Sequence, residues 1–164
     1  MFGNIFFDPD DKMIEWLIKE VIKNRTVFDI GCGTGELLFR LKEKDYHRLV
    51  GVDPFTDYFE FQKEAFNRTN ERIHLFQNSI NDAPIVTLLT NLPKGTGVGL
   101  LCRPCHHHSL TKGTYDIFSA LDIPLYYIGL EKNLEQDLED YDIPYVELIH
   151  EGSSEDNEKV YRLV

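Results

Sequence analysis

Apolar runs of strand length alternate with helical stretches along almost the whole chain, and this alternation restricts the fold more than any other feature. The apolar runs predict five strands, over residues 26–31, 48–53, 72–77, 97–103 and 123–130. Between them, apolar residues recur at helical spacing. Strands that alternate with helices predict a parallel sheet that is covered by helices on both faces.

The helices are expected at definite places. The first begins with Asp8 as its N-cap and Pro9 at its first helical position. Its apolar face consists of Ile14, Leu17, Ile18, Val21 and Ile22. Further helices are expected around Leu37, Leu38 and Leu41, over 58–66, over 82–92, around Tyr115, Phe118 and Leu121, and over 133–141.

The C-terminal end of the sequence breaks the alternation. Residues 144–151 and 159–164 have strand-like patterns, and the turn-rich segment between them leaves no room for a helix, which predicts an antiparallel hairpin at or near one edge of the sheet. We therefore expect an α/β fold with a doubly wound, mostly parallel seven-stranded sheet. One domain over residues 1–164 is expected, in which residues 1–25 form an N-terminal segment and helix.

The composition narrows the class of protein. No run of about 18 apolar residues is present, and the first residues lack the pattern of a signal peptide. Three cysteines without an export signal indicate reduced thiols, so a cytoplasmic protein is expected. The formal net charge of −11 disfavours nucleic acid as a direct partner, because it repels a phosphate backbone. The oligomeric state is left open.

A glycine-rich loop follows the first predicted strand. In VFDIGCGTGELLFRL, Gly31, Gly33 and Gly35 separate the strand from a helix, where they allow unusual backbone angles and a close approach by a ligand. Asp53 ends the next strand, where a carboxylate can accept both hydroxyl protons of a ribose. A tight turn between strand and helix, and a helix cap ahead of Pro54, are the alternatives that require no ligand.

The spacing of this loop is G-x-G-x-G and differs from the dinucleotide fingerprint G-x-G-x-x-G. With Asp29 two residues before the first glycine, the chain resembles the class I S-adenosylmethionine-dependent methyltransferases. Their first motif is matched by residues 29–35, their second-strand acid by Asp53, and their terminal hairpin by 144–164. The resemblance implies a Rossmann-like methyltransferase fold over nearly the whole chain, with S-adenosyl-L-methionine as cofactor.

The resemblance also implies roles for individual residues. Asp29 would lie near the amino group of the methionine moiety, directly or through water, and Asp53 would hold the ribose. The backbone of the glycine loop, Cys32 included, would lie against the methionine moiety. The residues that the resemblance assigns to cofactor binding are Asp29, Gly31, Cys32, Gly33, Gly35, Asp53, Pro54, Phe55, Asn78, Ser79 and Ile80.

The loop after the fourth strand is the candidate for catalysis. In LLCRPCHHHSL it holds Arg103, Cys105 and His106–His108. The resemblance implies that this loop faces the methyl group. However, the loop lacks the Asn/Asp-Pro-Pro-aromatic run that amine-methylating members carry, which argues against methylation of a base amine. We expect His106 or His107 as general base and Arg103 as the group that orients an anionic substrate.

The cysteines and histidines of this loop are also typical of haem and zinc sites. Cys102-x-x-Cys105-His106 has the spelling of a haem attachment site, and zinc could use Cys102, Cys105 and a histidine. A structural zinc site needs four ligands, and the strand would hold Cys102 inside the sheet, so no metal is predicted.

Three functional hypotheses follow. The first is a methyltransferase that acts on a small molecule or a partner protein. The second is a non-catalytic or partner-dependent protein with the same fold, and the third is metal or haem binding through 102–108.

Overall fold

The computed structural model describes residues 11–33, 35–46, 48–54, 73–102, 112–129, 131–140, 143, 147–151 and 159–164. The strands are β1 Thr26–Ile30, β2 Leu49–Val52, β3 Ile73–Phe76, β4 Gly97–Cys102, β5 Leu125–Gly129, β6 Glu147–Glu151 and β7 Lys159–Arg162. The helices are α1 Asp11–Leu17, η2 Ile18–Ile22, α2 Glu36–Glu43, α4 Ala83–Thr90, α5 Lys112–Ala120 and α6 Glu131–Asp140.

The seven strands form one sheet in the order β3-β2-β1-β4-β5-β7-β6. Strands β1 to β5 are parallel, whereas β7 pairs antiparallel with both β5 and β6. The mostly parallel sheet and the C-terminal hairpin are therefore as predicted. The strand order reverses between β1 and β4, and in open α/β sheets ligands bind in the crevice beyond the carboxyl ends of the strands at such a point.

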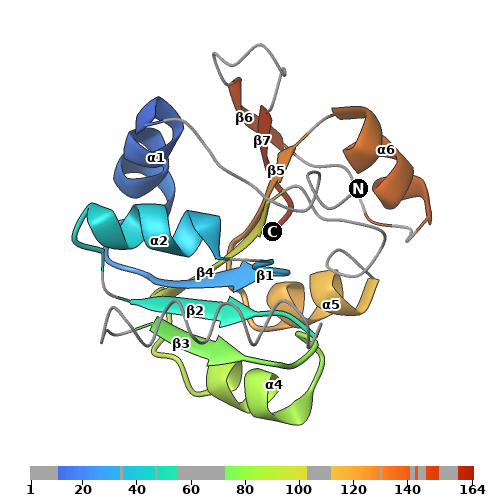
Figure 1. The fold of residues 1–164 in the computed structure, drawn as a ribbon. Coiled ribbons are helices and arrows are strands. Elements are labelled where there is room, and N and C mark those ends of the chain that lie inside the picture. The colour runs from blue at the N-terminus through green and yellow to red at the C-terminus, as the bar shows by residue number, and fades with distance from the viewer. Residues whose placement is uncertain are drawn as a thin grey trace.

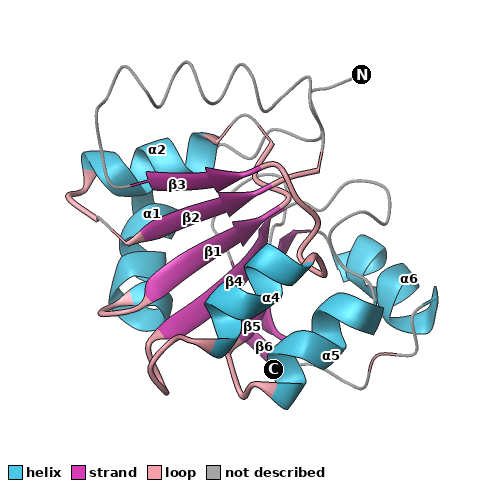
Figure 2. Ribbon diagram, turned by 90° about the horizontal axis from the view of Figure 1, so that it is seen from below, coloured by secondary structure: helices cyan, strands magenta, loops and turns pink. Residues whose placement is uncertain are grey.

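Helices cover both faces of the sheet (Figure 1). Helices α1, η2 and α2 bury their apolar residues with Val27, Leu49 and Val98 on one face. Helices α4, α5 and α6 do the same with Phe28 and Leu101 on the other face. Figure 2 shows α4 and α5 in front of the sheet, with α1 and α2 behind it. This arrangement confirms the doubly wound architecture.

The first helix differs from the prediction in its pitch. Its second half, η2, is a π-helix, whereas the spacing of the apolar residues predicts an uninterrupted α-helix. Ile14, Leu17, Val21 and Ile22 are nonetheless buried, as expected. Asp8 and Pro9, the predicted start of the helix, lie outside the described residues, and so does the helix predicted over 58–66.

One close contact ties α5 to the sheet. A Cβ placed on Gly99 of β4 would lie 2.5 Å from Cε1 and 2.7 Å from Cζ of Phe118. The glycine thus lets a fully buried aromatic ring lie directly against the β4 backbone. Leu121, which the sequence assigns to this helix, follows its last residue. Within the described part of the chain, no helix is long and apolar enough to cross a membrane.

Candidate functional site

The glycine loop leaves β1 at the carboxyl edge of the sheet, in a conformation that suits glycine. Gly31, Gly33 and Gly35 have φ values of 72°, 55° and 83°, in the left-handed region that side-chain-bearing residues rarely adopt. The N–H groups of Gly31 and Cys32 both donate to the carbonyl oxygen of Val52, at 2.7 and 3.2 Å. The loop is therefore attached to the end of β2 and leads directly into α2.

Asp53 lies at the same edge, one residue beyond β2. Its Oδ2 accepts a hydrogen bond of 3.0 Å from the N–H of Gly33, and its own N–H donates to the carbonyl oxygen of Phe76. The residue is only 4% exposed. The sequence places this acid 22 residues after Gly31, and the fold brings its carboxylate into contact with the loop.

Asp29 is the second buried acid of the site. It pairs with Gly51 on β2 and Leu100 on β4, and its neighbours Phe28 and Ile30 belong to the core on the α4 and α5 side. Because side chains alternate along a strand, the Asp29 carboxyl faces the α1 and α2 side, where Cys102 is also buried. The residue is 2% exposed, and its carboxyl accepts no hydrogen bond from the described residues.

The electrostatics of Asp29 follow from this position. Burial, and to a smaller extent the neighbouring Asp53 carboxylate, raise the pKa of Asp29 from 3.8 to about 7. Burial and the nearby Asp29 likewise raise the pKa of the Cys102 thiol well above its ordinary value. The ligand-free protein therefore holds Asp29 mostly protonated below about pH 6 and about half protonated near pH 7, whereas an ionised carboxylate there calls for a positive charge.

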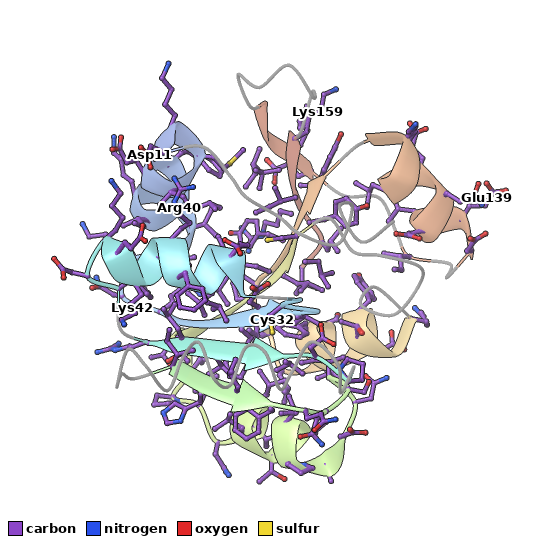
Figure 3. The ribbon with its side chains drawn as sticks, viewed as in Figure 1. Asp11, Cys32, Arg40, Lys42, Glu139 and Lys159 are labelled. Atoms are coloured by element: carbon purple, nitrogen blue, oxygen red, sulfur yellow. The ribbon has the colours of Figure 1, made fainter. Side chains whose placement is uncertain are left out.

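Cys32 occupies the middle of the loop and is nearly buried, at 8% exposure. Figure 3 shows it near the middle of the molecule, where β1 passes into the loop. A Cβ placed on Gly51 would lie 3.0 Å from its Sγ and 2.8 Å from Cδ1 of Leu38. The absence of a side chain at Gly51 thus makes room for the loop and for α2.

The loop after β3 contains the three residues that the resemblance assigns to the adenine. Oδ2 of Asp82 accepts hydrogen bonds from the Ser79 N–H at 2.9 Å and from Nδ2 of Asn78 at 3.2 Å. The carbonyl oxygen of Asp82 also accepts the N–H groups of Ile85 and Val86 at the start of α4. Asn78 and Ser79 are partly exposed and fixed in a turn, whereas Ile80 is 2% exposed and packs in the core.

Several predicted site residues are not among those that the structure describes. Phe55, Arg103, Cys105, His106, His107 and His108 lie outside the described residues. Pro54 is exposed directly after Asp53. Strand β4 ends at Cys102, so the predicted catalytic segment follows the strand next to β1. Among the residues that the structure describes, no cluster of His, Cys, Asp and Glu could hold a metal ion.

The sequence did not identify Gly51, or the electrostatic link between Cys102 and Asp29, as parts of the site. A glycine inside an apolar strand signals a close approach, so LVGVD offered a clue to the first. The second depends on the pairing of β1 with β4, which no local pattern reveals.

Comparisons with known proteins agree with this geometry. Residues 27–91 match the family model described as a methyltransferase domain. An S-adenosylmethionine-dependent methyltransferase from Aquifex aeolicus has the same fold, with a TM-score of 0.62, 16% identity, and coverage of 96% of this chain and 95% of that one. Magnesium protoporphyrin IX methyltransferase from Synechocystis, whose structure holds S-adenosylmethionine, has a TM-score of 0.57 and 15% identity, and the likeness covers 93% and 76% of the two chains.

The curated relatives share only part of the chain. A tRNA U34 carboxymethyltransferase from Shewanella baltica is 39% identical over 66 residues, which cover 38% of this chain and 20% of the relative. The match thus extends over about a fifth of the relative's length.

The strand order and the glycine loop at the carboxyl edge define a Rossmann-like methyltransferase fold. The family resemblance indicated by the sequence, to the class I S-adenosylmethionine-dependent methyltransferases, is thereby confirmed.

Proposed function

We propose that the chain binds S-adenosylmethionine and transfers its methyl group to a small molecule or a partner protein. The observation that carries this proposal is the hydrogen bond between the Gly33 N–H and Asp53 Oδ2, which joins the glycine loop to an acid at the edge where β1 and β2 end. In this arrangement Asp53 could bind the ribose of a nucleoside, and the rest of the ligand could lie close to the backbone of the glycine loop.

The residues present fit this cofactor. Asp29 is a buried carboxyl without a hydrogen-bond donor among the described residues, and a cationic amino group supplies both a donor and a compensating charge. Asp53 is a carboxylate fixed by a backbone N–H, which suits the hydroxyl groups of a ribose. When bound, the cofactor supplies a methyl group on a positively charged sulfur.

The other proposed cofactor contacts come from the glycine loop and from the residues that follow β2 and β3. Gly31, Cys32, Gly33 and Gly35 offer backbone to the methionine moiety, while Pro54 and Phe55 would flank the adenine. Asn78 and Ser79 are available for polar contacts because they are partly exposed. Ile80 packs in the core, so a contact with the adenine would require its side chain to turn towards the loop edge.

Catalysis is assigned to the segment that follows β4. Methyl transfer is an in-line displacement, so the protein mainly has to align a deprotonated nucleophile with the methyl group. We propose His106 or His107 as the base that accepts the proton of the nucleophile, and Arg103 as the group that orients an anionic part of the substrate.

The binding step is tested by calorimetry with S-adenosylmethionine. Wild-type protein should bind, and Asp53→Ala should bind at least tenfold more weakly, because a hydrogen bond to a charged group contributes about 1.5–3 kcal/mol. Asp116→Ala is the matched control, because Asp116 pairs with Lys112 at exposed positions of α5, on the face of the sheet opposite to Cys32. Absence of binding by the wild-type protein at roughly millimolar ligand contradicts the proposal.

The transfer step is tested with a cofactor that carries a labelled methyl group, incubated with a cell lysate. Label on an acceptor that disappears with Asp53→Ala supports a methyltransferase. Binding of the cofactor without transfer to any fraction favours the alternative, a non-catalytic or partner-dependent protein with this fold.

A second candidate function is action on tRNA. It is favoured by the 39% identity with the Shewanella baltica tRNA U34 carboxymethyltransferase, although that match spans only 66 residues. The net charge of −11 opposes it, because a phosphate backbone is repelled. Labelled material that is sensitive to ribonuclease would favour tRNA as the acceptor, whereas resistant material would favour a small molecule or a protein.

A further inference from the structure

Among the residues that the structure describes, those around Asp29 offer no group that could neutralise a negative charge. On β2 it pairs with Gly51, and Asp53 follows at the strand end. On β4 it pairs with Leu100, and Cys102 lies two residues further on the same face. Above it, helix α2 contributes apolar side chains to the same core. A carboxylate in such surroundings is destabilised relative to the neutral acid.

Arg162 on β7 pairs with Tyr126 and shares this face of the sheet, but β7 is three strands away from β1. On the described strands nearer to Asp29 and in the described part of the glycine loop, the other titratable groups of this face are acids. They are the Asp53 carboxyl, the Cys32 and Cys102 thiols and, one strand further away on β5, the Tyr126 phenol. In the described part of the chain, no Lys, Arg or His has an electrostatic effect on Asp29, and the charged group that acts on it is Asp53. The ligand-free site therefore contains two buried carboxyl groups and no compensating cation among the described residues.

We propose that Asp29 carries a proton in the ligand-free protein and releases it to solvent when a positively charged ligand binds beside it, which presupposes the cofactor site proposed above. The acid's O–H bond breaks heterolytically and the proton passes to the buffer, so the bound ligand faces a carboxylate. S-adenosylmethionine carries an ammonium and a sulfonium group, and either charge favours the ionised form of Asp29. The affinity for S-adenosylmethionine then depends on pH through the ionisation of Asp29.

The pKa of Asp29 determines how strongly the affinity for S-adenosylmethionine depends on pH. With the pKa of Asp29 at about 7, about nine tenths of the free protein holds this proton near pH 6. Because only the ionised form binds the cation well, the affinity for S-adenosylmethionine should rise about tenfold between about pH 5 and about pH 6. It should level off above about pH 7.

Proton release is measured by titration calorimetry in buffers of different ionisation enthalpy. Near pH 6 the α-amino group of the ligand, with an ordinary pKa of about 8, is already protonated, so the released proton comes from the protein. We expect about 0.9 proton per bound S-adenosylmethionine near pH 6. Adenosine, which has neither positive charge, is the matched probe and should bind without releasing a proton.

The proton is assigned to Asp29 with a variant and a spectrum. In Asp29→Asn, proton release should vanish and the remaining affinity should not change between about pH 5 and about pH 7. If that variant no longer binds, carbon-13 NMR of the aspartate carboxyls in the wild-type protein tests the assignment. The Asp29 signal is the one that is missing from the spectrum of the variant. In the free wild-type protein this signal should titrate near pH 7, and with S-adenosylmethionine bound it should stay ionised down to about pH 5.

The outcomes separate this inference from the proposed function. Binding of S-adenosylmethionine without proton release near pH 6, equal proton release with adenosine, or an Asp29 signal that titrates near pH 4 would each overturn the coupling while leaving the cofactor site in place. A wild-type protein that does not bind S-adenosylmethionine, but whose Asp29 titrates near pH 7, would instead refute the proposed function.

Discussion

The N–H of Gly33 donates a hydrogen bond of 3.0 Å to Oδ2 of Asp53, across the gap between the glycine loop and the end of β2. Two further hydrogen bonds run from the same loop to the carbonyl oxygen of Val52. The loop and the acid are thereby positioned together before any ligand arrives, so the shape of the site is a property of the fold.

The first prediction separates the two contributions of Asp53. Asp53→Asn keeps an oxygen that can accept the Gly33 N–H but loses the charge, whereas Asp53→Ala loses both. We expect the affinity for S-adenosylmethionine to fall about tenfold for the asparagine variant and about a hundredfold for the alanine variant, from lost hydrogen bonds to a charged acceptor. Calorimetry measures both, and equal losses would show that the contact with Gly33 does not contribute to binding.

The second prediction concerns stability and pH. The pKa of Asp29 is raised from 3.8 to about 7, so below about pH 4 it is protonated in both the folded and the unfolded chain and burial carries no electrostatic penalty. As the pH rises towards 7, the unfolded chain loses the proton while the folded protein keeps it, and about 4 kcal/mol of stability is lost.

Asp29→Asn removes this loss, because the amide does not titrate. The free energy of unfolding of the variant, relative to wild type, should therefore increase between about pH 4 and about pH 7 and stay level above that. Urea unfolding of the ligand-free proteins over this pH range measures it. A difference that does not depend on pH would contradict the assignment.

The third prediction concerns Gly51. Its substitution by alanine places a Cβ 2.7 Å from Leu75 Cδ2, 2.8 Å from Leu38 Cδ1 and 3.0 Å from Cys32 Sγ. Since these atoms lie on side chains that can move, we expect Gly51→Ala to lower stability by about 1–2 kcal/mol. Displacement of Cys32 should also weaken binding of S-adenosylmethionine several-fold, as measured by calorimetry on the folded variant.

Gly99→Ala is the matched substitution on the opposite face of the sheet. Its Cβ would meet the Phe118 ring at 2.5 Å, and an aromatic ring yields less easily than a leucine tip, so a loss of about 2–3 kcal/mol is expected. Binding of the cofactor should be unchanged, because Phe118 packs on the α5 side. Adding Phe118→Leu should recover part of the stability, and failure to do so would exclude this clash as the cause.

The fourth prediction concerns the Tyr46 hydroxyl. It accepts the N–H of Arg25 at 3.0 Å and contacts the carbonyl oxygens of Ile22 and Arg25, where η2 turns into β1. Tyr46→Phe leaves these partly buried backbone groups without that partner and should lower stability by about 1–3 kcal/mol. Tyr115→Phe on α5 is the control, with an expected change within about 0.5 kcal/mol. Thermal unfolding compares the two.

The five parallel strands were predictable because each lies in a mostly apolar run, as a sheet covered on both faces requires. The position of Asp53 was predictable for the same reason, since an acid directly after such a run has to lie at the sheet edge. The π-helical turn of η2 could not be predicted from the sequence. Ile14, Leu17, Val21 and Ile22 are buried, and their spacing suits an α-helix as well as a helix with a π-helical turn.

The raised pKa of Asp29 could not be predicted from the sequence either. It depends on which groups surround the carboxyl, and these come from β2, β4 and α2, far apart along the chain. The resemblance implies that this acid lies near a cationic amino group, whereas its raised pKa depends on the packed structure.

Strand β7 lies between β5 and β6 in the sheet although it follows both in the chain. During synthesis, β6 therefore emerges from the ribosome before its neighbour exists, and it stays without a pairing partner in this sheet until residues 159–162 have been made. One side of the sheet can close only when β7 inserts. Any chain that stops before Lys159 loses this side of the sheet and leaves the edge of β5 open to association with other chains.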